Sequence, residues 1–314
     1  MAQPTVKNVR PIDPVLTNLS IGFKNERFLW DKLAPAIEVS EKSGTYFNYT
    51  RDFWFRRQEG AERAAEGPYQ RVGFGVGTST YSTIEYGFEK LLGDVVIASS
   101  QTPDSLEQLS IAFLTNLIQL ELEKLVSAAT FVSGKWGTDK TLTGTGQWSD
   151  FANSDPIADF DLALRTVRRN TGAKPNTVFM GLLGWEKLKE HPLILDKYKH
   201  VQTAILTEEL VAAALGISEL IVGDSVENTA AEGASYVGAD IWTDNAVILV
   251  RNNPGLFVAN GASTFVWNER DNVPWAAENY REEKNRSEVH RVFSHYDPQI
   301  VSKEHGYMLL DLVA

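Results

Sequence analysis

The stretch from Pro103 to Val132 constrains the fold more than any other part of the chain. Thr102 is a capping residue, and Pro103 suits the first position of a helix. Apolar side chains recur at spacings of three and four residues along two stripes: Leu106, Leu109, Phe113, Leu117 and Leu120, and Ile111, Leu114, Ile118, Leu122 and Leu125. Three charged residues interrupt the apolar surface near its middle: Glu121, Glu123 and Lys124. This pattern predicts a spine helix, about 45 Å long and buried on two sides.

The chain before this helix is predicted to form an arm and a flap, neither of which can bury itself. The arm, Met1 to Gly44, has three prolines in its first fourteen residues, which favour an extended path. Residues 45–93 predict two strands joined by a polar, glycine-rich tip at residues 58–77. The strand-forming aromatic residues are Tyr46, Tyr49, Phe53, Trp54 and Phe55 before the tip and Tyr81, Tyr86 and Phe88 after it. Such a flap is marginal in water and needs a surface to pack on.

The chain after the spine helix predicts a compact mixed layer. Asp155 caps and Pro156 opens a helix that Gly172 ends. Alternating segments follow: strands at Thr177–Met180, Glu219–Val222 and Ala246–Val250, and helices at Gly184–Glu190, which Pro192 stops, and from a Thr207 cap through Leu215. Two further strands are expected at Ser263–Trp267 and Glu288–His295. The apolar tail, Tyr307–Val313, is predicted to dock into the main sheet.

Composition excludes several classes of protein. The net charge of −11 repels phosphate, which argues against a dedicated nucleic-acid binder but allows a container for DNA. The absence of cysteine excludes disulfides, thiolate metal sites and cysteine nucleophiles. Residues 1–10 lack the apolar core of a signal peptide, and polar residues interrupt the longest apolar stretches, so we expect no signal peptide and no membrane contact.

The motifs of catalysis are missing from the sequence. No two of the five histidines have the i, i+4 spacing of a metalloprotease site: His191, His200, His290, His295 and His305. The run Gly73, Gly75, Gly77 is too loose for a phosphate-binding loop, and a flexible tip explains it better. Acidic pairs such as Asp159 and Asp161 are expected by chance among 41 acidic residues. We therefore predict a protein that is not an enzyme, with no catalytic residue, cofactor or metal.

Several segments resemble the major capsid proteins of tailed double-stranded DNA phages, which share the Hong Kong 97 fold. The resemblance covers nearly the whole chain and is a match of overall pattern. Its segments are the opening Leu16-Thr-Asn-Leu-Ser-Ile-Gly-Phe-Lys-Asn-Glu, the arm Lys32-Leu-Ala-Pro-Ala-Ile-Glu-Val, the flap start Ser43-Gly-Thr-Tyr-Phe, Thr207-Glu-Glu-Leu, and Leu215-Gly-Ile-Ser-Glu-Leu-Ile-Val-Gly-Asp-Ser-Val-Glu-Asn-Thr-Ala. It implies an α+β fold with an arm, an extended β loop, a spine helix in a peripheral domain and a mixed α/β axial domain.

The resemblance also implies a division of the chain. The implied ranges are 1–44 for the N-terminal arm, 45–92 for the extended loop, 93–171 for the peripheral domain, 172–255 for the axial domain and 256–314 for strands that return to the peripheral domain. The implied function is self-assembly through pentamers and hexamers into an icosahedral shell around packaged DNA. The implied location is the virion capsid, after assembly in the host cytoplasm.

The candidate interface anchors are aromatic residues of the arm and flap: Trp30, Trp54 and Tyr81. Large amphipathic rings are common at subunit interfaces, but each of these is also a candidate for plain core. Two alternatives stay open. An encapsulin-like nanocompartment has the same fold and encloses enzymes, and a hydrolase or transferase would use the α/β segment.

Two family variations give further expectations. Some members cross-link covalently through a lysine of the extended loop and an asparagine of a neighbour, but residues 45–89 contain no lysine and Lys90 lies only at the base of the loop. We therefore expect no such cross-link. Other members carry a long cleaved scaffolding segment before the arm, whereas here Met1 lies almost directly at the arm. We expect a separate scaffolding protein and a portal as partners, besides the chain itself and its packaged DNA.

Overall fold

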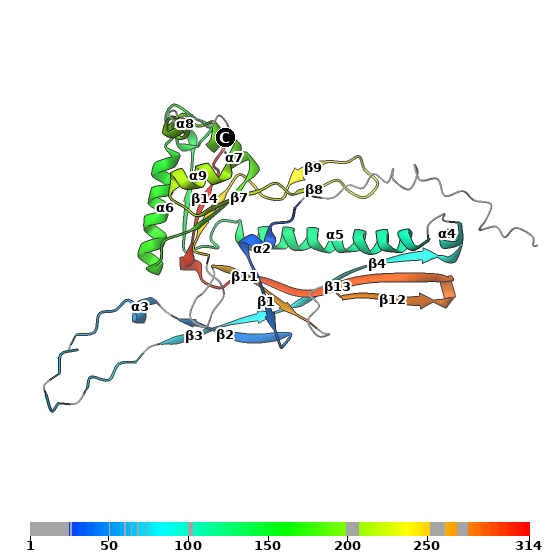
Figure 1. Ribbon diagram of the computed structural model, residues 1–314, viewed down its shortest axis with the longest axis horizontal. Coiled ribbons are helices and arrows are strands. Elements are labelled where there is room, and N and C mark those ends of the chain that lie inside the picture. Colours follow the sequence, from blue (N-terminus) through cyan, green and yellow to red (C-terminus); the bar gives the residue numbers. More distant parts are fainter. Residues whose placement is uncertain are drawn as a thin grey trace, which may run out of the picture.

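The computed structural model describes most of the chain (Figure 1). The described residues are 25, 27–49, 51–59, 61–63, 65–67, 69–73, 75–99, 103–198, 207–251, 261–268 and 276–314. The predictions made for residues 1–24 of the arm, for the cap at Thr102 and for His200 lie outside these ranges.

The predicted spine helix forms as α5 (Pro103–Thr130). It lies along one face of a five-stranded sheet, and a short helix, α4 (Asp94–Ser99), precedes it (Figure 1). The sheet contains five strands: β1 (Ala36–Val39), β4 (Ile84–Gly93), β11 (Ala262–Trp267), β12 (Ala276–Glu282) and β13 (Ser287–Ile300). The long strand β13 pairs with β4 along one side and with both β11 and β12 along the other. We call this unit the spine sheet. The expected burial of α5 on two sides is wrong for its N-terminal half, where Leu109 and Phe113 of one stripe are about half exposed because the spine sheet covers only the other side.

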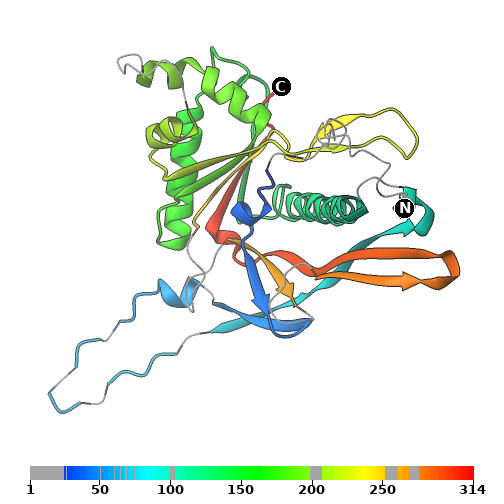
Figure 2. The ribbon, with the colours of Figure 1, turned by 45° about the vertical axis from the view of Figure 1, so that its right-hand side comes forward.

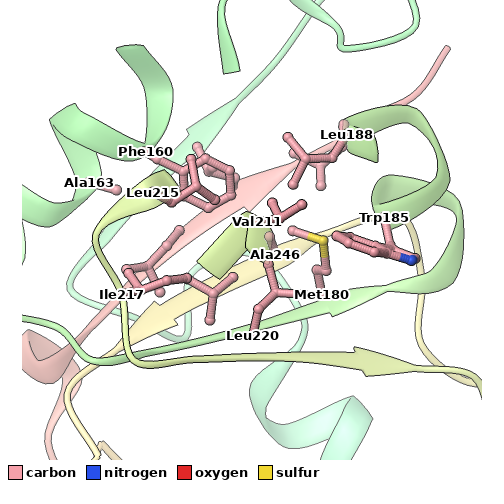
Figure 3. Packing of buried hydrophobic residues seen from close by; sticks show 14 of the residues in the cluster. Phe160, Ala163, Met180, Trp185, Leu188, Val211, Leu215, Ile217, Leu220 and Ala246 are labelled. Atoms are coloured by element: carbon pink, nitrogen blue, oxygen red, sulfur yellow. The ribbon is translucent and has the colours of Figure 1, made fainter. Parts of the chain in front are cut away.

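A second five-stranded sheet has the order β5-β14-β10-β6-β7. Its strands are β5 (Thr138–Thr141), β6 (Thr177–Gly181), β7 (Glu219–Gly223), β10 (Ala246–Leu249) and β14 (Gly306–Leu310). Four helices cover one face: α6 (Pro156–Thr171), α7 (Leu182–Glu190), α8 (Pro192–Tyr198) and α9 (Glu208–Leu215). The apolar side chains between these helices and the sheet form a close-packed core (Figure 3). We call these five strands the axial sheet, and the sheet with its four helices the axial unit.

Alternate residues of the axial strands enter two different cores. In β14, Tyr307 and Leu309 pack under the helices, whereas Met308 and Leu310 pack on the side of α5. A sheet that is covered on both faces has apolar strands without polar alternation, as β14, β6 and β10 show. The tail is therefore docked into a main sheet, as predicted, and it lies between β5 and β10.

Local end signals explain the helices of the axial unit. The Asp155 carboxylate accepts a hydrogen bond from Ala158 N at 3.0 Å, and Gly172 ends α6 at φ 72°. Thr207 likewise caps α9, and Gly216 ends it at φ 70°. Pro192 follows the end of α7, as predicted, but it also opens α8, because proline suits the first turn of a helix.

The predicted flap consists of β2 (Ser43–Tyr49) and β3 (Val76–Ser82), which pair antiparallel, with a tip that extends away from the body in both views (Figures 1 and 2). Two details differ from the sequence-based expectation. The strand predicted at residues 78–89 is divided at Thr83 into β3 and β4, which belong to different sheets. Phe53 and Trp54, which were expected in a strand, lie in a short helix, α3 (Arg51–Trp54).

Three further features complete the described part of the chain. A short helix, α2 (Trp30–Leu33), precedes β1, and a hairpin of β8 (Val226–Asn228) and β9 (Gly238–Asp240) extends above α5 (Figure 1). Single turns of 3-10 helix lie at Gly144–Gly146, Glu283–Asn285 and Lys303–His305. Three elements outside residues 172–255 pack with the axial sheet: β5 and β14 are two of its strands, and α6 lies in its core.

Candidate assembly surfaces and the junction at Glu123

The only carboxylate buried inside the described part of α5 joins three segments that are distant in sequence. Glu123 is completely buried. Its Oε2 accepts hydrogen bonds from Leu29 N at 3.0 Å and from Trp30 N at 2.8 Å, at the start of α2. Its Oε1 accepts hydrogen bonds from Ser225 Oγ and from Trp242 Nε1, both at 2.7 Å. The arm, the spine helix and the axial unit therefore meet at one side chain.

The surroundings of Glu123 explain how a carboxylate is tolerated there. Burial raises the pKa of the Glu123 carboxyl, while each of its hydrogen bonds acts in the opposite direction. Trp242 also donates to Ser225 Oγ at 3.0 Å, and its ring lies where a side chain at Gly223 would stand, 2.5 Å from an added Cβ. Sequence reasoning noted Glu123 only as an interruption of the apolar stripe. An acidic residue on an apolar helix face was the available signal of a buried polar contact.

Trp30, the first candidate anchor, belongs to this junction. Its backbone N–H donates to Glu123, and its half-buried ring packs against the cluster between α5 and the two sheets. The arm is thus fixed to its own spine helix at this point. Trp30 combines a role inside the subunit with a partly exposed ring.

Tyr81, the second candidate, fixes the base of the flap. Its ring stacks on that of Phe265 of β11, with centroids 4.7 Å apart. The ring of Tyr46 in β2 also lies against Phe265, with centroids 5.3 Å apart. The Tyr81 hydroxyl donates to the carbonyl of Glu41 at 3.3 Å. These contacts hold β2 and β3 against the spine sheet, so Tyr81 acts within the chain.

Trp54, the third candidate, lies in the exposed part of the flap. Its side chain is 57% exposed, and that of the adjacent Phe55 is 60% exposed. Other large apolar residues of the flap are exposed as well: Phe47, Tyr69, Val72 and Val76. Large apolar side chains that are exposed on one projecting element suit an interaction surface. The structure therefore does not bring the three anchors together, and it leaves Trp54 on a surface suited to a partner.

Two neighbouring residues of the axial unit, Ser154 and His191, are of the types that serve as nucleophile and general base in enzymes. Ser154 Oγ lies 3.0 Å from His191 Nε2, and both residues are buried. However, His191 Nδ1 accepts the N–H of Leu193 at the start of α8, which places the ring proton on Nε2. The Ser154 hydroxyl in turn donates to the carbonyl of Asp150 at 2.7 Å. His191 therefore donates to the serine, the reverse of what a general base requires.

Metal-ligand groups and membrane-spanning helices are two further features that would bear on function in the described ranges. No three histidine or acidic side chains there are grouped as they would be around a metal ion. Among the helices that can be described, none has the length and apolar character needed to cross a bilayer.

The arrangement of arm, flap, spine helix and two sheets is shared with solved structures. A phage-related protein from Bordetella bronchiseptica RB50 superposes with a TM-score of 0.72 over 96% of this chain and 97% of its own, at 18% identity. The capsid of cyanophage P-SCSP1u gives a TM-score of 0.63 over 93% and 90% of the two chains, at 11% identity. The chain therefore has the Hong Kong 97 fold of capsid proteins, as the sequence resemblance implied.

Sequence comparison indicates which capsid proteins the chain is similar to. No family model matches the chain. The major capsid protein of Burkholderia phage BcepMu is 28% identical over 77% of each chain. The major capsid protein of Pseudomonas phage JBD67 is 26% identical over 77% of this chain and 78% of its own. These similarities confirm the predicted likeness to major capsid proteins of tailed phages.

Proposed function

We propose that this chain is the subunit of an icosahedral phage shell, which it forms with copies of itself through pentamers and hexamers. The observation that carries the proposal is the flap. It projects from the body and leaves Phe47, Trp54 and Phe55 exposed, although a two-stranded element needs a surface to pack on. A second copy is the simplest partner for a surface that every subunit carries.

Each unit of the fold has its own proposed role in the shell. The flap makes contacts with neighbouring copies, the spine sheet with α5 forms the peripheral domain, and the axial sheet meets its copies around five-fold and six-fold axes. The axial domain includes β5, α6 and β14 in addition to residues 172–255. This assignment is supported by the two separate clusters of buried side chains, one of which lies entirely within the axial unit.

We propose further partners from the net charge of the chain and from its resemblance to phage capsid proteins. The shell holds packaged double-stranded DNA without a sequence-specific grip, because a chain of net charge −11 repels phosphate. A separate scaffolding protein and a portal take part in assembly, which occurs in the host cytoplasm and ends in the virion. An encapsulin-like compartment has the same fold, but both sequence relatives are phage capsid proteins, which favours a container for a genome. We further propose that the chain has no enzymatic activity.

Electron microscopy with size-exclusion chromatography tests the proposal, on the protein alone and with its candidate scaffold. We expect shells, or pentamers and hexamers that convert to shells. A stable monomer or dimer under both conditions would argue against a capsid function.

Replacement of Trp54 by Ala should impair assembly without weakening the subunit. Truncation of a central interface aromatic costs about 2 kcal/mol or more per contact, whereas an exposed side chain contributes little to folding. Shell yield should therefore fall steeply while the melting temperature of the unassembled subunit stays unchanged. Trp54→Phe should keep most of the yield. Tyr81→Ala should instead lower the melting temperature, because Tyr81 stacks on Phe265. Normal shells from the Trp54→Ala variant would remove Trp54 from the interface.

Mature shells should contain no covalent link between subunits through a flap lysine. Residues 45–89 contain no lysine, and Lys90 lies in β4 of the spine sheet, outside the β2–β3 flap, with its ammonium 5.4 Å from the ring centroid of Phe113. Boiled shells should give one monomer band on a denaturing gel. A ladder of multimers in that gel would contradict this prediction.

A further inference from the structure

One face of α5 is covered in its C-terminal half and exposed in its N-terminal half. In the covered half, Glu123 binds α2, Lys124 pairs with Glu227 of β8 at 2.7 Å, and Ser127 Oγ donates to the carbonyl of Ile241 at 3.0 Å. With 3.6 residues per turn, the same face continues toward the N-terminus of the helix through the residues that we call the spine stripe: Leu109, Ala112, Phe113, Asn116, Leu117 and Leu120.

The spine stripe is apolar and in part exposed. Leu109 is 54% exposed and Phe113 is 50% exposed. No charged residue occurs in α5 between Glu107 and Glu121. A long helix that faces water normally carries charges on its outer face, so the stripe is suited to an apolar partner, although the Lys90 ammonium of β4 lies 5.4 Å from the ring centroid of Phe113.

The chain itself supplies such a segment at the right place. The Asn25 side chain makes two hydrogen bonds of 3.0 Å with the backbone of Val226, in the strand whose Glu227 pairs with Lys124. The chain thus arrives at the boundary between the covered and exposed halves. The ten residues that precede Lys24, Pro14 to Phe23, contain no charge. Their large apolar side chains include Leu16, Leu19 and Phe23.

Length and tethering favour the segment of the same chain over other occupants. From Lys124 to Leu109 the helix rises about 22 Å, and nine residues of extended chain span up to about 30 Å. A segment tethered at Asn25 also has an effective concentration far above that of a free partner. We propose that residues 14–23 dock on the spine stripe of their own subunit and continue the cover that α2 and the β8–β9 hairpin begin. This inference does not depend on shell formation.

Disulfide trapping tests the proposal directly, because the chain contains no cysteine. Phe113→Cys would be combined in turn with Leu16→Cys, Leu19→Cys or Phe23→Cys in the full chain, both unassembled and in shells. After oxidation, we expect at least one pair to give an intrachain link in most molecules, seen as a faster band on a non-reducing gel and confirmed by mass spectrometry. In the matched control, Leu162→Cys of α6 takes the place of Phe113→Cys. Leu162 is 47% exposed, and its cysteine should form no link with a cysteine at position 16, 19 or 23.

Each other outcome of the trapping experiment overturns the proposal. Links only between subunits would place the arm on a second copy, and equal links to Phe113→Cys and Leu162→Cys would mean no fixed docking. No link in any pair would leave the stripe to a different partner, such as a scaffold helix.

Limited proteolysis provides a second readout without cysteines. In the double variant Leu109→Asp/Phe113→Asp, tryptic cleavage after Lys24 should be about tenfold faster than in the unaltered chain, since cleavage follows the population of the open form. The Leu162→Asp variant should be cleaved at the original rate. An unchanged rate in the double variant would overturn docking on the stripe.

Discussion

Replacement of Glu123 by Ala is expected to lower the free energy of unfolding of the subunit by about 3–5 kcal/mol. The change leaves three donors without their acceptor: the N–H groups of Leu29 and Trp30 and the Ser225 hydroxyl. The Trp242 indole loses one of its two acceptors and keeps Ser225 Oγ. Each orphaned donor costs about 1–3 kcal/mol, partly recovered where water enters. Urea unfolding of the unassembled subunit, followed by tryptophan fluorescence, measures the loss.

Two further variants make this prediction specific. Glu121→Ala removes a less buried carboxylate from the same turn of α5 and should cost less than about 1 kcal/mol. Glu123→Gln keeps the shape but points an amide donor at other donors, so it should fall between the two. If Glu123→Ala were no more damaging than Glu121→Ala, the junction would not hold the arm, the spine helix and the axial unit together.

Deletion of residues 306–314 should abolish folding altogether. The deletion removes β14 from the interior of the axial sheet, where it pairs with both β5 and β10. It also takes away Met308 and Leu309, which are completely buried in two different cores. Loss of a central strand leaves two unpaired edges and a large cavity, and single core truncations alone cost about 2–5 kcal/mol. We expect insoluble protein, or soluble protein without a cooperative unfolding transition.

A shorter deletion is the control for this result. Removal of Ala314 alone breaks one exposed hydrogen bond, from its N–H to Ser149 Oγ at 3.1 Å, and should leave folding intact. A 306–314 deletion that still unfolds cooperatively would show that the axial sheet closes without β14.

The candidate site was only partly accessible to sequence reasoning. Aromatic residues in the arm and flap were found because their chemistry suits interfaces, but their surroundings were not predictable. Tyr81 stacks within the chain, whereas Trp54 stays largely exposed, although both are flap aromatics. The sequence showed Glu123 as a charge on an apolar helix face, but its structural role was not predictable. The four groups that donate hydrogen bonds to it belong to residues 93 to 119 positions away.

The sequence by itself determined the type and limits of the elements whose signals are local. The spacing of leucines in α5, the caps Asp155 and Thr207, and the terminators Gly172 and Gly216 all act within a few residues, so the corresponding helices form where they were predicted. The likeness to capsid proteins also came from the order of such elements.

Only the tertiary structure decided which elements pack together. The apolar tail was predicted to dock in a sheet, but its place in the axial sheet depends on β5 and β10, which lie far from it in sequence. The break at Thr83 divides one continuous strand pattern between two sheets, and α3 forms where aromatic residues predicted a strand. Periodicity reports which face of an element is apolar, whereas the partner of that face is chosen by packing over the whole chain.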